Sequence, residues 1–153
     1  MPVPDDNALG RAYKGSWRLP LHRSVQVREP DYGCYNVTNI DDPAYPHVKA
    51  IMYNTMVASD STLLCGELLP ALRIMVEHPK KSKYIQHWVS PIIMISLMEF
   101  KVLVLEIYYS KSRSCLVVRH SKVFDFTHGN NEAFNILAQW YLGKPTGDTV
   151  RGA

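Results

Sequence analysis

Glu106 occupies the position in this chain that most strongly suggests chemistry. It lies in Val102-Leu-Val-Leu-Glu-Ile-Tyr-Tyr109, an otherwise apolar run that is typical of a buried β-strand. A carboxylate in such a strand must face solvent, pair with a cation or line a cavity, because an unpaired buried charge is costly. Side chains alternate along a strand, so Glu106 shares a face with Val104 and Tyr108. The group beside that face decides what Glu106 does.

The next expected strand offers Glu106 two different partners. In one hairpin register Glu106 lies beside Arg119, and the two form a cross-strand salt bridge with a structural role. A shift by one residue exchanges that face for Val118 and His120. A carboxylate next to an imidazole in a partly buried groove suits proton transfer. Salt bridges are the more frequent arrangement, so the structural alternative is favoured, although the sequence leaves the register open.

The proton-transfer interpretation defines a complete candidate site. Glu106 and His120 form its catalytic pair, and Tyr108 or Arg119 stabilises the negative charge that develops on the reacting molecule. The candidate substrate-binding residues are Tyr108, Arg119, His87 and Trp88. His87 has a structural alternative, in which backbone groups satisfy its ring where the preceding strand begins.

Sequence motifs for several widespread chemistries are absent from the chain. It contains no P-loop, no glycine-rich dinucleotide motif, no serine-hydrolase elbow and no paired-histidine zinc motif. His120, Asp125 and His128 surround one expected turn, but their spacing does not favour a metal site. We therefore predict no metal and no cofactor. An enzyme of this kind would be a cofactor-independent isomerase, cyclase or lyase that uses acid–base chemistry.

Positive charge is concentrated in the middle of the sequence. The 153 residues carry a net charge of +3, from 17 Lys and Arg against 14 Asp and Glu. Residues 79–122 alone hold eight of the bases and two of the acids. Such a basic centre suits an anionic ligand or partner, although lysines also protect sheet edges. The aromatic and basic stretch 108–113 could bind single-stranded nucleic acid, but no nucleic-acid-binding consensus accompanies it, so this partner is disfavoured.

Cysteine usage and hydropathy indicate the compartment. Three cysteines at wide spacing form no CxxC pair, which argues against a structural zinc site and a thioredoxin-like motif. No secretory signal opens the sequence, and no apolar run approaches the roughly 18 residues of a membrane span. We expect reduced thiols, a cytoplasmic location and no membrane association.

Periodic patterns predict the elements that position these residues. Apolar residues at helical spacing favour two helices in the first half of the chain, over about 46–58 and 63–76. Alternation then indicates three strands, at 92–98, 101–109 and 114–123. A closing helix follows an asparagine cap and ends at Gly143. Weaker patterns suggest short strands at 24–28 and 34–38.

The order of these elements favours an α+β fold rather than a doubly wound sheet. We predict two helices in the N-terminal half, a three-stranded antiparallel meander and a C-terminal helix packed on the sheet. These elements form a single domain over residues 21–145, between a loose N-terminal arm at 1–20 and a polar tail at 146–153.

Two resemblances accompany this prediction. The helix, three strands and helix, with Glu67 in the helix before the sheet, resemble the core of PD-(D/E)XK nucleases. That family carries an acid on one strand and an acid-x-Lys on the next. Here the strands offer Glu106-Ile-Tyr108 and Val118-Arg-His120, so the resemblance implies a degenerate relative.

The second resemblance covers residues 85–150. They look like small uncharacterised proteins of filamentous fungi in three segments: His87-Trp-Val-Ser-Pro91-Ile-Ile-Met-Ile-Ser96, Leu116-Val-Val-Arg-His-Ser121, and Phe134 through Trp140 to Gly147-Asp-Thr149. This resemblance implies a fungal source and carries no activity.

The leading hypothesis is a pocket between sheet and helices that takes a small, largely apolar molecule. Methionines at core-facing positions support it, because flexible thioethers can line an irregular apolar cavity. The rival is a non-catalytic interaction module whose basic hairpin or exposed sheet edge binds an acidic partner, or its own copy as a homo-oligomer. A buried Glu106 near His120 favours the pocket enzyme, whereas an exposed Glu106, or one paired with Arg119, favours the module.

Overall fold

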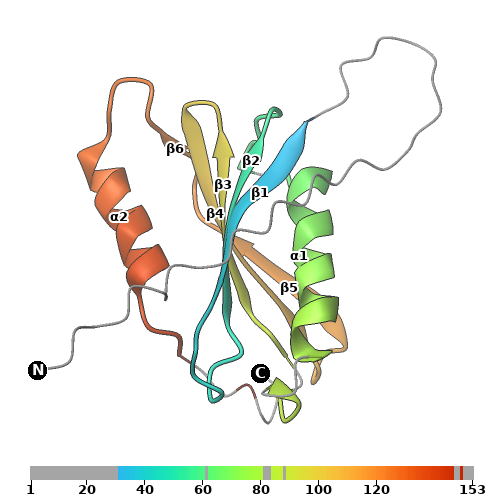
Figure 1. Cartoon of the computed structure of the whole chain (residues 1–153). Helices are drawn as coiled ribbons and strands as arrows, with labels where there is room; N and C mark the ends of the chain where they lie inside the picture. Colours follow the sequence, from blue (N-terminus) through green and yellow to red (C-terminus); the bar gives the residue numbers. More distant parts are fainter. Residues whose placement is uncertain (1–30, 61, 81–83, 88, 147–148, 150–153) are drawn as a thin grey trace, which may run out of the picture.

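A mixed β-sheet forms the centre of the molecule, with one helix on each of its faces (Figure 1). The computed structural model describes residues 31–60, 62–80, 84–87, 89–146 and 149. Its six strands are β1 (Tyr32–Asn39), β2 (Val48–Asn54), β3 (Ile92–Met98), β4 (Lys101–Ser110), β5 (Cys115–His120) and β6 (Phe124–Asp125). Its helices are α1 (Cys65–Glu77), which continues into a short 3-10 turn at His78–Lys80, and α2 (Asn131–Leu142).

The main strands lie in the order β1-β2-β3-β4-β5, which follows their order in the chain. β2 and β3 run parallel and α1 connects them, whereas every other neighbouring pair is antiparallel. The short β6 pairs with the beginning of β4, and β5 pairs with the rest of it. Among the described residues, β1 therefore forms one edge of the sheet, and β5 and the short β6 form the other.

The predicted architecture, with two N-terminal-half helices and a three-stranded meander, is wrong. The sheet has six strands of mixed direction, and the segment expected as the first helix contains strand β2. Val48, Ala50 and Met52 are fully buried in the core, and Lys49 alternates with them. A strand covered on both faces is apolar at most positions, so helical spacing can arise in it by chance. Pairing with β1 and β3, which no local pattern reveals, decides its conformation.

Most other described elements agree with the sequence pattern, except that the strand expected at 114–123 ends at His120 and the short β6 is not predicted. The three expected central strands are β3, β4 and β5, and residues 34–38 lie within β1. The second expected helix is α1, and the closing helix is α2, which ends before Gly143. The Asn130 side chain caps α2 by accepting a hydrogen bond from a backbone N–H of the first turn. The arm predicted at 1–20 and the strand predicted at 24–28 lie outside the described residues.

Two apolar layers hold the helices to the sheet. The larger layer includes Ala71 of α1 together with buried side chains of β2, β3 and β4. The smaller layer includes Ala133 of α2, packed with Ile95 and Val104 of the sheet. Leu105 belongs to the first layer and Val104 to the second, as alternation along β4 requires. Glu106, the next residue after Leu105, is therefore on the α2 face.

Candidate functional site

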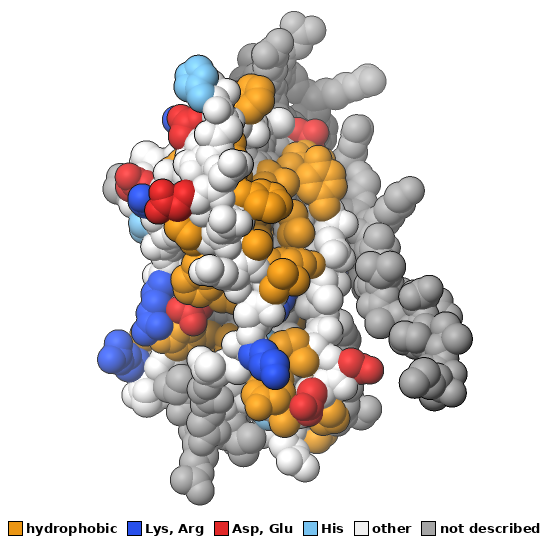
Figure 2. Space-filling model, turned by 90° about the vertical axis from the view of Figure 1, so that its left-hand side faces the viewer, with side chains coloured by type: hydrophobic (Ala, Val, Ile, Leu, Met, Phe, Trp, Pro, Cys, Tyr) orange, Lys and Arg blue, Asp and Glu red, His pale blue; other side chains and the backbone are white. Residues whose placement is uncertain are grey.

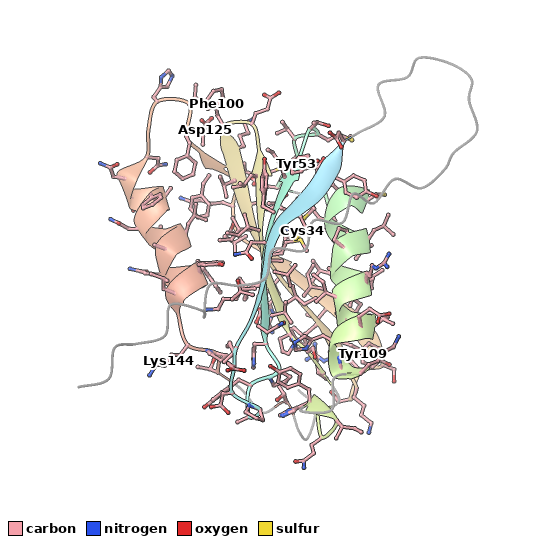
Figure 3. The ribbon with its side chains drawn as sticks, viewed as in Figure 1. Cys34, Tyr53, Phe100, Tyr109, Asp125 and Lys144 are labelled. Carbon is pink, nitrogen blue, oxygen red and sulfur yellow. The ribbon has the colours of Figure 1, made fainter. Side chains whose placement is uncertain are left out.

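A pocket of about 730 Å³ opens on the α2 face of the sheet. It lies where β2 and β3 begin and where α2 ends, and the segment after α2 forms part of its wall. Lys144 of that segment follows the end of α2 (Figure 3). Figure 2 shows this side of the molecule, with Lys and Arg side chains gathered along one flank and hydrophobic side chains spread across the middle.

A single row of side chains crosses the floor of the pocket. The strand register pairs Lys49 with Ile93, Ile93 with Glu106, and Glu106 with Arg119. All four residues line the pocket. They face the same way because residues paired directly across neighbouring strands point to one face of a sheet. The floor thus presents two cations, one carboxylate and one apolar side chain.

Glu106 lies in the first of the two expected hairpin registers. Its Oε2 accepts a hydrogen bond from Arg119 Nη1 at 3.2 Å, in a cross-strand ion pair. The side chains of Arg119 and Glu106 are 65% and 32% exposed, so solvent limits the stabilisation from this pair to about 1 kcal/mol or less. The Arg119 guanidinium also lies over the Tyr108 ring, 5.5 Å from its centroid. These contacts hold a cation at the pocket floor.

The structure does not bring His120 to Glu106. His120 lies opposite Leu105 in the register, and Leu105 belongs to the core layer under α1, so the imidazole is on the other face of the sheet. The exposed His120 donates from Nδ1 to the Ser121 carbonyl oxygen at 2.9 Å. The pairing with Arg119 is the arrangement expected of an interaction module rather than of the pocket enzyme, although Glu106 also lines the pocket.

His87 has both of its ring nitrogens engaged in the interior. Nε2 donates to the Pro43 carbonyl oxygen at 2.8 Å, and Nδ1 then accepts from the Thr149 hydroxyl, also at 2.8 Å. Both His87 and Thr149 are buried. The ring links the loop before β2 to the segment after α2, which matches the structural alternative for His87. Trp88, the neighbouring candidate, lies outside the described residues.

Lys49 joins the floor of the pocket to the end of α2. Its ammonium donates to the carbonyl oxygens of Tyr141 and Gly143, the latter at 2.9 Å. The end of a helix carries partial negative charge, so a cation is favourable there. Burial lowers the pKa of the Lys49 ammonium. The sequence pattern does not identify Lys49 because it favours a helix in this segment, whereas alternation in a strand places the side chain on the α2 face.

His47 is a further buried pocket residue that the sequence pattern does not single out. It directly precedes β2, and its Nδ1 has no hydrogen-bond partner among the described residues. Burial lowers the pKa of the His47 imidazole; a backbone hydrogen bond at Thr146 opposes this effect, and repulsion from His87 adds to it when that ring is protonated. The neutral ring is therefore favoured in the folded protein.

Trp140 and Lys144 line the pocket from the helix side. Trp140 is 46% exposed and offers a broad aromatic surface. Lys144 forms no hydrogen bond or ion pair within the part of the chain that the structure describes. The spacing of apolar residues in α2 places Trp140 at the border of the apolar face of the helix. It does not predict the pocket, because the other side of the pocket is formed by β2.

Two other acidic residues that the sequence singles out, Asp125 and Glu67, have structural roles. Asp125, labelled in Figure 3, accepts hydrogen bonds from the Thr127 N–H and hydroxyl, at 2.8 and 2.6 Å, and these bonds lower its pKa. Glu67 is buried and accepts a hydrogen bond from the Leu64 N–H at the start of α1. Within the described ranges, no group of three or more His, Cys, Asp or Glu side chains is arranged to hold a metal ion. No described helix is long and apolar enough to cross a membrane.

No family model, no curated protein and no solved structure matches this chain. The resemblances to proteins of filamentous fungi and to PD-(D/E)XK nucleases therefore stay predictions.

Proposed function

We propose that this protein binds a small molecule with an apolar body and an anionic group in the pocket between the sheet and α2. The volume of about 730 Å³ falls within the range of small-molecule sites. The row that runs from Lys49 through Ile93 and Glu106 to Arg119 is the observation that supports the proposal, because it places two cations and an apolar side chain together on the floor of the pocket.

The charge of the pocket favours an anionic group. Lys49, Arg119 and Lys144 line it against one carboxylate, that of Glu106. Glu106 is already paired with Arg119, so an excess of positive charge is left to attract a carboxylate, sulfonate or phosphate. Lys144 is the strongest candidate for direct contact, because it has no ion pair within the described residues.

The remaining lining suits the apolar body of such a ligand. Ile93, which is only partly buried, contributes aliphatic surface, and Trp140 contributes an exposed indole. An aromatic face can stack on a flat ring, which adds about 0.5–1.5 kcal/mol beyond the buried area. A ligand with a ring near one end and an anion at the other would use both parts of the pocket.

Binding, rather than proton transfer by Glu106 and His120, is the activity that this geometry supports. His120 lies across the sheet from the pocket, and the Glu106 carboxylate is held by Arg119. In this proposal Glu106 is a positioning residue that keeps the guanidinium on the floor.

Anilinonaphthalene sulfonate, an aromatic anion, is a suitable probe. We expect saturable binding to the native protein in a fluorescence titration, and weaker binding of the neutral analogue N-phenylnaphthylamine. Lys144→Ala is expected to weaken binding of the anion about two- to fivefold. Lys101→Ala is the matched control, because Lys101 lies at the other end of β4.

Two results would contradict the proposal. One is equal affinity for the anionic and the neutral probe, which would show that the charges of the pocket are not used. The other is an equal effect of Lys144→Ala and Lys101→Ala on the anion, which would place the bound probe elsewhere.

A further inference from the structure

Strand β5 leaves one edge of the sheet open. It pairs with β4 on one side, and no described strand lies on its other side (Figure 1). The Ser121 N–H donates to the Val104 carbonyl oxygen at 2.9 Å, so these two residues form a hydrogen-bonded pair of the antiparallel ladder. Hydrogen-bonded pairs recur at every second residue along β5, and the residues between them direct their backbone groups away from β4. The backbone N–H and C=O groups of Leu116, Val118 and His120 therefore point away from β4. No hydrogen bond between described residues engages these groups, so they are available to another strand.

The α1 side of this edge is apolar. Leu116 and Val118 face that side and pack against the core layer under α1. A second cavity, of about 390 Å³, lies between α1 and the start of β5. Its lining includes Leu72, Val76 and Tyr109, which are 38%, 60% and 41% exposed. Tyr109 lies beside the end of α1 (Figure 3), so an apolar side chain added next to Leu116 would meet this surface.

Basic side chains surround this edge, and one of them, Arg119, is on the α2 side. The exposed Lys111, Arg113 and Lys122 lie around the two ends of β5. A second copy of β5 paired edge to edge would bring like charges together, which is destabilising. The charge pattern therefore favours an acidic partner over a second copy of this chain.

We propose that the open edge of β5 binds an extended segment of another protein, in which acidic and apolar residues alternate, as an added strand of the sheet. The backbone of that segment pairs with the outward groups of Leu116, Val118 and His120. Its apolar side chains lie on the α1 side, against the cavity that Val76 lines, and its acidic side chains lie beside Arg119 on the α2 side.

A synthetic peptide of alternating Glu and Val residues, blocked at both ends, is the probe for this edge. We expect it to bind the full-length protein in a fluorescence anisotropy titration about tenfold more tightly than a matched peptide with Lys in place of Glu. Equal affinity for the two peptides overturns the proposal, because the basic side chains around the edge would then make no contribution.

Backbone methylation separates strand addition from simple charge attraction. In an antiparallel added strand the Val residues lie opposite Val118 and donate to β5, whereas in a parallel strand the Glu residues donate. Two methylated peptides are compared, one methylated at the Val backbone nitrogens and the other at the Glu backbone nitrogens. We expect one of them to bind about tenfold or more weakly than the parent peptide, because its methylated nitrogens can no longer donate hydrogen bonds to β5, and the other to bind like the parent. If both methylated peptides bind like the parent peptide, the segment is not an added strand.

A protein variant locates the contact. Arg119→Ala is expected to weaken binding of the Glu and Val peptide about two- to fivefold, and Lys101→Ala to leave it unchanged. Circular dichroism and urea unfolding verify that both variants are folded. Equal effects of the two substitutions overturn the proposal, as does a dimer of the free protein that the peptide dissociates, since the edge would then belong to a second copy.

Discussion

Lys49→Met tests how the wall of the pocket is held to its floor. Methionine keeps an unbranched chain in the row across the sheet but removes the ammonium. The Tyr141 and Gly143 carbonyl oxygens at the end of α2 then lose a charged donor. The end of the helix and Lys144 after it would be held less firmly over β2.

The size of the effect follows from opposing contributions. Hydrogen bonds to charged groups stabilise by about 1.5–3 kcal/mol, and a cation at a helix end adds about 0.3–1 kcal/mol. Lys49 is half-buried, and the desolvation that lowers its pKa offsets part of this gain. We expect Lys49→Met to lower the free energy of unfolding by about 1–2 kcal/mol and Tm by about 2–8 °C.

Urea unfolding followed by circular dichroism measures this change, with Lys101→Met as the matched control at the far end of β4. The same variant is expected to bind anilinonaphthalene sulfonate more weakly, because the helix side of the pocket is less well placed. The role given to Lys49 would be refuted if the urea midpoint of Lys49→Met equalled that of the parent protein. It would also be refuted if Lys49→Met and Lys101→Met shifted the midpoint equally.

Two histidines yield further predictions. Burial depresses the pKa of His47, so its contribution to stability is complete above the unfolded-state pKa of about 6.5 and is lost as the pH falls through the lowered folded-state pKa. As the pH is lowered from about 7.5 to 5.5, the urea concentration at the unfolding midpoint should decrease. The decrease should be smaller in His47→Gln than in the exposed control His128→Gln, and equal decreases in the two variants would argue against this role. His87→Phe should lower the free energy of unfolding by about 1–3 kcal/mol, because the Pro43 carbonyl and the Thr149 hydroxyl lose their partner; an unchanged midpoint would speak against it.

Local patterns predict the elements whose conformation is decided locally. β4 has a long apolar run with one charge, and α2 has an asparagine cap and a glycine end, so both are predictable from the sequence. β2 is not, because its two buried faces make its pattern compatible with a helix. Its conformation depends on strands that are distant in the sequence, and the error there hides both Lys49 and the pocket.

The hairpin register is the second feature that the sequence leaves open. The turn between β4 and β5 contains no glycine, yet Ser114 adopts a left-handed conformation with φ of 51°. This conformation is uncommon for serine, so the residue types do not specify the turn. Ser110 pairs with Cys115 in the resulting register, which sets Glu106 opposite Arg119. The apolar run singles out Glu106, but the partner of this carboxylate depends on that turn.

Native mass spectrometry of the protein, purified gently from the cells that express it naturally, tests the pocket most directly. We expect the native mass to exceed the denatured mass by an amount on the order of a few hundred daltons per chain, for a bound molecule with an anionic group. The added mass should decrease in Lys144→Ala and persist in Lys101→Ala. A native mass equal to that of the bare chain, or a clean homo-oligomer with no added mass, would contradict the proposed binding function.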